Sequence, residues 1–260
     1  MPKVCVVGIG TVGYPTASYI NQHGFQVCGY DVNERKVEGF EVFTDWGKVP
    51  PDIEIFVVTV STSLGGGILD ASPIFDVGRK IADKNRHCLV SIESTIPVGT
   101  CRRVGDEFGL DYLVHVPHRY WIGDPERYGV RQMRVMGAID EESLKKGLDF
   151  YGQLDIPIHV AGTIEIAEMC KLVENAHRYV EIAFAESVAI ICRQMGLPFD
   201  MVQEASNTKW NTNILEAREG IGGECLTMCI DYLHRQGRKG TPLLEGAIQA
   251  DKNYREFINQ

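Results

Sequence analysis

The segment VCVVGIGTVGYPTA, residues 4–17, restricts the possible folds of this chain more than any other stretch. A short apolar run typical of a buried strand leads into Gly8, Gly10 and Gly13, and a helical pattern follows. Glycines at this spacing permit a tight turn, a close approach of the backbone to a pyrophosphate, and close packing of helix on strand. The segment therefore predicts the first strand–turn–helix unit of a dinucleotide-binding sheet. The other loop residues expected at the cofactor are Ile9, Thr11 and Val12.

A carboxylate follows at the end of the next predicted strand. The stretch FQVCGYD ends in Asp31, 18 residues beyond Gly13. A carboxylate at this place accepts hydrogen bonds from the adenosine ribose and repels a 2′-phosphate, so NAD is favoured over NADP. Arg35 argues in the opposite direction, because an arginine just past the acid accommodates a 2′-phosphate, but we expect Asp31 to dominate. The glycine pattern by itself also suits FAD, another nucleotide or a turn without a ligand.

Short apolar runs alternate with amphipathic stretches up to about residue 161. The predicted strands are Lys3–Gly8, Phe25–Asp31, Ile53–Val60, Cys88–Ile92, Tyr112–Val116, Met133–Ala138 and Pro157–Val160. The predicted helices are Val12–His23, Asn33–Glu38, Pro73–Lys84, Val98–Phe108 and Glu141–Leu154. This alternation of strands and helices, with strands of parallel type, predicts an α/β fold with a Rossmann-like doubly wound sheet.

The remaining sequence has a helical pattern. Glu165–Met195 contains no proline or glycine and places apolar residues three and four positions apart, which predicts one long helix that ends at Gly196. Shorter helices are predicted at 199–207 and Leu243–Phe257. We therefore expect a dinucleotide-binding domain over residues 1–161 and a helical domain over residues 162–260.

The charge and cysteine content exclude several classes of protein. The 260 residues include 26 Lys or Arg and 35 Asp or Glu, so the formal net charge of −9 argues against nucleic acid or anionic membranes as partners. The N-terminal apolar run is too short for a secretory signal, and no stretch of about 18 apolar residues predicts a membrane span. The eight cysteines mostly lie inside apolar runs, as reduced thiols do. We expect a cytoplasmic protein.

Two cysteines, Cys225 and Cys229, follow a glycine cluster in the stretch GIGGECLTMC. Half of a metal site, a buried pair of small apolar side chains and a loop that presents a nucleophilic sulfur are three open interpretations. No second pair of cysteines completes a zinc site, so we expect no metal.

Three further stretches complete a family pattern. They are ESTIPVGT at 93–100, AEMCKLVENAHRYVEIAFAESVAIICRQMGL at 167–197, and EASNTKWNTNILEAREGIGGEC at 204–225. In this order, and together with the glycine motif, they resemble the UDP-glucose/GDP-mannose dehydrogenase family of nucleotide-sugar dehydrogenases. The resemblance covers nearly the whole chain.

The resemblance implies an NAD-dependent oxidoreductase that converts a primary alcohol of a nucleotide sugar to a carboxylate with two NAD. A cysteine captures the aldehyde as a thiohemiacetal, whose oxidation gives a thioester that water hydrolyses. Cys225 matches this nucleophile, and Gly222 and Gly223 allow the sugar to approach it closely. Lys171 and Asn175, one helical turn apart, match the residues that stabilise the oxyanion.

Other positions match the family or depart from it. Thr95 matches a threonine that holds a catalytic water near the nicotinamide, although it also suits a helix-capping hydroxyl. Cys229 stands where the family carries an aspartate, and Asp231 is the nearest acid. His118 replaces a family glutamate in VPHRYWIGD, and either general acid–base catalysis or neutral hydrogen bonding suits it. The neighbouring Arg119 still matches. Residues expected to line the cofactor in place of the family's proline-rich segment are Thr59, Ser61 and Thr62.

These departures leave more than one function open. The sequence ends where the family's third domain, which contacts the nucleotide diphosphate, is expected to begin, so the substrate is a sugar nucleotide or a smaller alcohol. We favour an active NAD-dependent dehydrogenase. The alternatives are an NAD-binding homologue with lost or single-step catalysis, and a regulatory or scaffold subunit of a larger assembly. A homodimer through the 165–195 helix is expected, because its apolar residues are too many for one solvated face.

Overall fold

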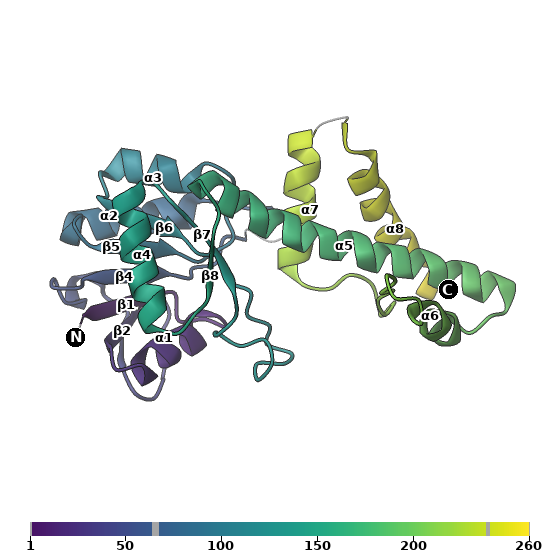
Figure 1. Cartoon of the computed structure of the whole chain (residues 1–260), viewed down its shortest axis with the longest axis horizontal. Helices are drawn as coiled ribbons and strands as arrows, with labels where there is room; N and C mark the ends of the chain where they lie inside the picture. Colours follow the sequence, from purple (N-terminus) through teal and green to yellow (C-terminus); the bar gives the residue numbers. More distant parts are fainter. Residues whose placement is uncertain (1, 64–67, 238–239, 260) are drawn as a thin grey trace. The chain divides into compact units, whose positions relative to one another are not determined.

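The computed structural model describes residues 2–63, 68–237 and 240–259 (Figure 1). They form two compact units. Unit 1 comprises Met1–Thr62 and Asp70–Lys171, and unit 2 comprises Ser63–Leu69 and Leu172–Gln260. The domain boundary after residue 161 stays a prediction. Along the described residues, no helix combines the length and the apolar character needed to cross a membrane.

Unit 1 is built on an eight-stranded sheet with the order β3-β2-β1-β4-β5-β6-β7-β8. All neighbouring strands are parallel except β6 and β7, which are antiparallel. The sheet confirms the predicted Rossmann-like α/β fold. The strands are β1 (Lys3–Val7), β2 (Gln26–Tyr30), β3 (Glu41–Phe43), β4 (Ile55–Val58), β5 (Leu89–Ile92), β6 (Tyr112–His115), β7 (Arg134–Ala138) and β8 (Ile158–Val160).

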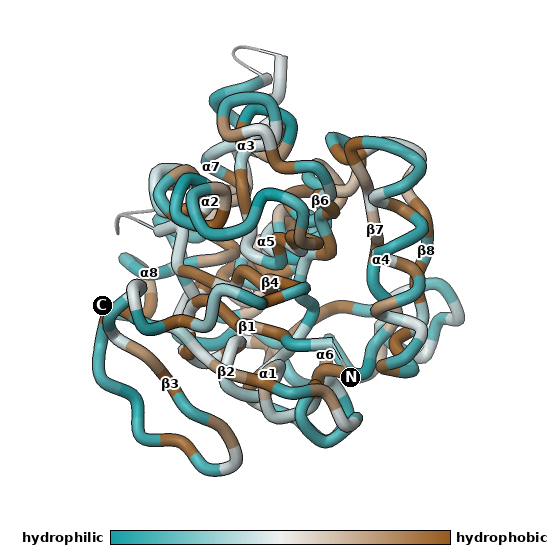
Figure 2. The backbone as a smooth tube through the Cα atoms, turned by 90° about the vertical axis from the view of Figure 1, so that its left-hand side faces the viewer, coloured by the Kyte–Doolittle hydropathy of each residue, from teal (hydrophilic) through white to brown (hydrophobic). Residues whose placement is uncertain are grey.

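Helices cover both faces of this sheet because alternate strand residues point to opposite sides. Val4 and Val6 of β1 pack in one core with α1 (Gly13–Gln22) and α4 (Glu141–Gln153), while Cys5 and Val7 pack in another with α2 (Ser72–Asn85) and α3 (Thr100–Phe108). Figure 2 shows the apolar character of the central strands β1 and β4, which are buried on both faces. A short 3₁₀ helix, η1, spans Trp46–Lys48.

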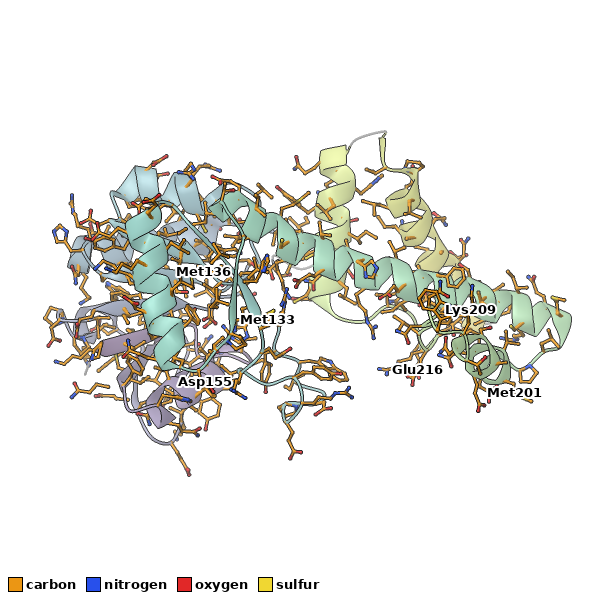
Figure 3. The ribbon with its side chains drawn as sticks, in the orientation of Figure 1. Met133, Met136, Asp155, Met201, Lys209 and Glu216 are labelled. Carbon is orange, nitrogen blue, oxygen red and sulfur yellow. The ribbon has the colours of Figure 1, made fainter. Side chains whose placement is uncertain are left out.

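The antiparallel β6–β7 pair follows from the connection between these strands. Residues 116–133 contain no helix that could carry the chain across the sheet, and a parallel pair needs such a crossover. Met133 at the end of this connection is exposed, whereas Met136 on β7 is fully buried (Figure 3).

The helix predicted at Asn33–Glu38 is wrong. The segment has bends and no regular hydrogen bonding, and most of its side chains are exposed. The Asp31 carboxylate accepts the Asn33 N–H at 2.9 Å, which holds the chain in a turn instead. A six-residue segment without a buried face cannot offset the cost of helix nucleation. Strand β3, which follows it and pairs with β2, is too short to be recognised from its sequence.

The long helix is confirmed as α5, Ile164–Met195, which begins in unit 1 and continues into unit 2. Gly196 ends it with a left-handed φ of 71°, as predicted. Unit 2 also contains α6 (Phe199–Asn207), α7 (Glu224–Gly237) and α8 (Pro242–Ile258). Helices α6 and α8 match the predictions, whereas no helix was predicted at α7.

Candidate functional site

The predicted glycine turn is present at the carboxyl end of β1. Gly8 has a φ of 94°, and its N–H donates to the Tyr30 carbonyl at 2.8 Å. A Cβ atom on Gly13 would lie 1.8 Å from the Gly8 oxygen, so only glycine allows α1 to approach the strand this closely. The Thr59 hydroxyl fixes the turn by donating to the same oxygen at 2.8 Å. Among the described residues beyond its two chain neighbours, no atom lies within 4 Å of a Cβ position on Gly10, which leaves space for a phosphate.

Asp31 lies beside this turn at the end of β2. One carboxylate oxygen accepts the Ile9 N–H at 2.8 Å, and the other accepts the Asn33 N–H at 2.9 Å. The Arg35 guanidinium lies 3.3 Å from the first oxygen. A carboxylate has about four acceptor sites, so these three contacts leave Asp31 with one site for a ribose hydroxyl. The ion pair occupies Arg35 and thereby weakens its case as a 2′-phosphate ligand.

A pocket of about 320 Å³ joins these features. The predicted cofactor residues Ile9, Thr11 and Val12 do not line it: the Ile9 side chain is buried, Thr11 is exposed and Val12 is half-buried. The first turn of α1 carries no acidic residue that would repel a phosphate. The geometry therefore fits an adenosine and a pyrophosphate. The predicted residues that line the pocket are Gly8, Gly10, Asp31, Arg35, Thr59 and Ser61.

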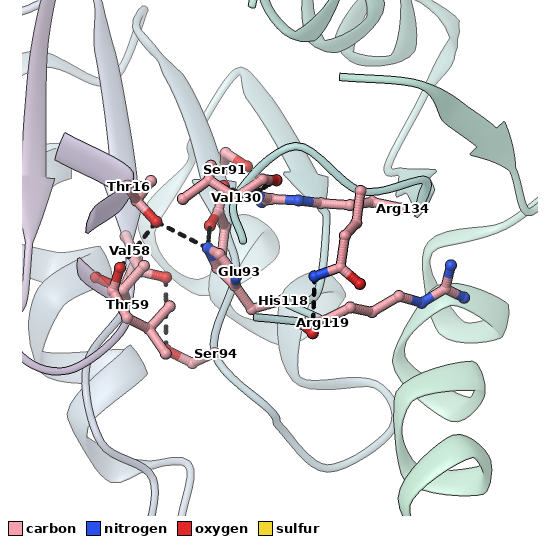
Figure 4. A network of polar contacts seen from close by, with 12 residues as sticks. Thr16, Val58, Thr59, Ser91, Glu93, Ser94, His118, Arg119, Val130 and Arg134 are labelled. Atoms are coloured by element: carbon pink, nitrogen blue, oxygen red, sulfur yellow. Dashed lines mark hydrogen bonds and ion pairs between the residues drawn. The ribbon is translucent and has the colours of Figure 1, made fainter. Parts of the chain in front are cut away.

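A buried polar network lies at the carboxyl ends of β5 and β6 in the same unit (Figure 4). The Glu93 carboxylate lies 2.7 Å from His118 Nε2 and 3.0 Å from Arg134 Nη1, and it accepts the Tyr151 hydroxyl at 2.5 Å. His118 Nε2 also lies 2.8 Å from the Thr16 hydroxyl on α1. The network thus connects the helix behind the glycine turn to the strand that precedes Thr95.

The charges in this network are well defined. Burial raises the pKa of the Glu93 carboxyl, but Arg134 and His118 outweigh it and bring that pKa to about 2. Burial, together with the Arg134 charge, lowers the pKa of His118 to about 4. Glu93 and Arg134 are therefore an ion pair near pH 7, and His118 is neutral there. Of the two roles predicted for His118, this geometry favours neutral hydrogen bonding over acid–base catalysis, which works best with a pKa near the working pH.

The other predicted residues of unit 1 lie around this network. Thr95 is half-buried, and its carbonyl accepts the Thr62 hydroxyl at 2.6 Å. Arg119 donates to the Met133 carbonyl at 2.7 Å, which ties down the β6–β7 connection. Lys171 on α5 is near enough for its charge to contribute to the lowered pKa of His118. Their predicted catalytic and substrate-binding roles stay predictions.

Sequence reasoning missed the importance of Glu93, Arg134 and Tyr151. Glu93 opens the ESTIPVGT block directly after an apolar strand, and that position at a strand end was an available signal. No sequence pattern linked Arg134 and Tyr151 to Glu93, because they stand 41 and 58 residues after it in the chain. Only the fold brings the three together.

Unit 2 presents the two cysteines differently. Cys225 is exposed in the first turn of α7. This helix begins directly after Gly223, which has a φ of 91°. Cys229, one turn later, is fully buried and accepts the Asn175 amide at 3.3 Å. Asp231 forms an ion pair with Arg235 at 3.3 Å. An exposed thiol behind glycines suits a nucleophile, and the buried thiol fixes the amide of Asn175.

The expectation of no metal stays a prediction. The described residues contain no cluster of three or more His, Cys, Asp or Glu side chains that could hold a metal ion. All eight cysteines are free thiols.

Two sequence models of known families match this chain. Residues 2–42 match the NAD-binding domain of the UDP-glucose/GDP-mannose dehydrogenase family, and residues 165–253 match its central domain. The chain belongs to the UDP-glucose/GDP-mannose dehydrogenase family. The first match includes the glycine turn and Asp31, and thereby supports NAD as the cofactor.

Individual members of the family give the same result. UDP-N-acetyl-D-mannosamine dehydrogenase of Methanocaldococcus jannaschii is 28% identical, and the match covers 87% of this chain and 60% of that protein. NDP-N-acetyl-D-galactosaminuronic acid dehydrogenase of Ralstonia nicotianae is 27% identical, with 86% and 62% covered. The chain therefore spans about 60% of the length of these curated relatives.

Solved structures of the family share the fold. The UDP-D-ManNAc dehydrogenase of Pyrococcus horikoshii matches with a TM-score of 0.88 at 25% identity, over 98% of this chain and 69% of that one. A UDP-glucose dehydrogenase of Pyrobaculum islandicum matches with a TM-score of 0.82 at 22% identity, over 97% of this chain and 68% of that one.

Proposed function

We propose that this protein is a cytoplasmic NAD-dependent dehydrogenase that oxidises a primary alcohol of a nucleotide sugar towards a carboxylate. The observation that carries the proposal is the pocket formed by the glycine turn and Asp31, in a chain that also matches the family's central domain. The eight free cysteines support a reducing compartment.

The residues of this chain supply the steps around hydride transfer. NAD, when bound along the glycine turn, accepts the hydride. The Cys225 thiolate then adds to the aldehyde carbon to give a thiohemiacetal, and Lys171 and the Asn175 amide stabilise its oxyanion. The thiohemiacetal carbon would give its hydride to a second NAD, and this step leaves a thioester and releases the hydroxyl proton to solvent. Water held near Thr95 hydrolyses the thioester to the carboxylate and releases the thiol.

The substrate class rests on the relatives. Those with the names quoted above act on UDP-N-acetylmannosamine or on a related nucleotide sugar. We propose a UDP-N-acetylhexosamine as the first substrate to test, with a smaller primary alcohol as the alternative. The test is a screen of nucleotide sugars and small alcohols for NADH formation. Cys225→Ser should abolish formation of the acid while NAD still binds, and an unchanged rate of acid production would refute the covalent route.

Cys229→Ser is the matched control for this test. Its thiol is buried and contacts Asn175, so we expect a reduced rate but continued acid formation. An active Cys225→Ser protein beside an inactive Cys229→Ser protein would reverse the two assignments.

We also propose a homodimer through α5. Val173, Phe184, Ile191 and Met195 are 47–68% exposed. Their spacings are close to whole helical turns, so they share one face of the helix. A second copy of this helix would cover that face. Sedimentation should show a particle of twice 29.0 kDa, and Phe184→Asp should shift it to the monomer.

A second candidate function is NAD binding with single-step or lost catalysis. Cys229 favours this alternative, because a buried thiol there accepts a hydrogen bond from Asn175 instead of supplying a carboxylate. Aldehyde as the final product, or NAD binding without turnover of any sugar nucleotide, would support it.

A further inference from the structure

Two cysteines outside the proposed reaction lie opposite each other beneath the glycine turn. Cys5 on β1 and Cys28 on β2 are register partners in the parallel ladder. Neighbouring strands are about 4.8 Å apart, which lies inside the range of about 4.4–6.8 Å that disulfides span between Cα atoms. Both side chains point into the same core, with Cys5 fully buried and Cys28 9% exposed.

We propose that Cys5 and Cys28 form a reversible disulfide when the protein meets hydrogen peroxide, and that this modification switches off the dinucleotide site. The Cys28 thiolate attacks the peroxide, which gives a sulfenic acid and releases water after proton uptake. The Cys5 thiol then attacks the Cys28 sulfur, so that a second water leaves and the disulfide forms. One peroxide is reduced and two thiols are oxidised.

The surroundings assign separate roles to the two thiols. Cys28 is 9% exposed whereas Cys5 is fully buried, so peroxide reaches Cys28 first and Cys28 is the attacking sulfur. Cys5, buried opposite Cys28, is the resolving sulfur, and its proton joins the hydroxyl group that leaves Cys28 as water. A separation near the short end of the disulfide range strains the bond and makes it easy to reduce, as a reversible switch requires.

The disulfide would act on the cofactor site through the two strands. Gly8 and Asp31 stand three residues beyond Cys5 and Cys28, respectively. The two strand ends are joined by the Gly8 N–H bond to the Tyr30 carbonyl and the Ile9 N–H bond to the Asp31 carboxylate, both 2.8 Å. Tilting the strands towards disulfide geometry displaces these bonds. We expect NAD affinity to fall about tenfold, which corresponds to a loss of about 1.4 kcal/mol of binding free energy.

The test uses the full chain with Cys225→Ser, so that the exposed thiol does not compete for peroxide. No Lys or Arg stands between Cys5 and Cys28, so trypsin leaves both in the peptide Val4–Arg35. After peroxide treatment this peptide should weigh two hydrogens less and resist alkylation, and dithiothreitol should reverse both effects. Calorimetry should show about tenfold weaker NAD binding in the linked protein.

Two further variants keep the test decisive. Cys5→Ala should leave Cys28 as a sulfenic acid that a sulfenic-acid label traps, without loss of the two hydrogens. Cys88→Ser is the matched control, because burial raises the pKa of that thiol to about 12, and this variant should form the disulfide normally. Alkylation of both thiols after peroxide, or equal NAD affinity in linked and reduced protein, would overturn the proposal. Failure of the reduced protein to bind NAD would instead count against the proposed function.

Discussion

Replacing Glu93 by glutamine is the sharpest test of the buried network beside the cofactor site. The change keeps the shape of the side chain but removes the charge that balances Arg134, 3.0 Å away. Arg134 is 1% exposed, so water cannot solvate its charge, although its bond to the Val130 carbonyl at 2.9 Å remains. Removing one partner of a buried pair costs about 3–5 kcal/mol of unfolding free energy.

The other contacts of Glu93 also contribute to this loss of unfolding free energy. Glu93 also accepts the Tyr151 hydroxyl and lies 2.7 Å from His118 Nε2, and a neutral amide interacts with both less strongly than a carboxylate does. The pKa of Glu93, about 2, lies below its usual 4.5, so the charged form stabilises the fold above about pH 4.5. That contribution is lost as the pH falls through 2. The variant should therefore differ from the wild type at pH 7 and approach it in acid.

The assay is urea unfolding at pH 7, followed by tryptophan fluorescence. In a Trp210→Phe background the remaining tryptophans, Trp46 and Trp121, report on unit 1 alone. Adding Arg134→Met to Glu93→Gln should recover part of the loss, because it removes the unpaired buried charge. A loss below about 1 kcal/mol for Glu93→Gln would refute the assignment of a buried, charged pair.

Four other substitutions separate fold from function. Burial and the nearby Asp251 raise the pKa of Glu186 to about 7, so its contribution to stability is present below about pH 4.5 and is lost as pH rises through 7. The unfolding temperature of the wild type should fall over that pH range, while that of Glu186→Gln should stay level. Parallel dependence of the two unfolding temperatures on pH would contradict this. Gly10→Ala should keep stability but weaken NAD binding, whereas Gly13→Ala should destabilise unit 1, because its Cβ would lie 1.8 Å from a backbone oxygen. Urea unfolding with NAD titration checks both. Asp31→Asn should lower NAD affinity about tenfold and narrow the preference over NADP; an undiminished preference by calorimetry would show that another group reads the ribose.

The sheet could be predicted from the sequence because its signals are local. The apolar strands and the glycine turn each occupy fewer than 15 consecutive residues, and their order specifies the fold. The prediction of a helix at Asn33–Glu38 was wrong because the Asp31 carboxylate accepts the Asn33 N–H and holds the backbone in a turn. Helix α7 was missed although Leu226, Ile230 and Leu233 follow helical spacing, since the glycines before it favour a loop.

The site was only partly predictable. Gly8, Gly10 and Asp31 belong to a short sequence pattern from which a cofactor site could be predicted, and the structure places them around one pocket. The lowered pKa of His118 comes from its burial and from the charge of Arg134, which lies on a different strand, and neither has a local signal. A pairing of that kind requires the fold.

We propose that this protein oxidises a nucleotide sugar twice, and the number of NADH molecules formed per sugar distinguishes this from a single oxidation. Purified protein would be incubated with limiting UDP-N-acetylmannosamine and excess NAD, and NADH and sugar products would be counted at completion. The account predicts two NADH and one carboxylate for each sugar consumed, with no carboxylate from Cys225→Ser. One NADH with free aldehyde, or NAD binding without any NADH across the full screen of nucleotide sugars and small alcohols, would contradict it.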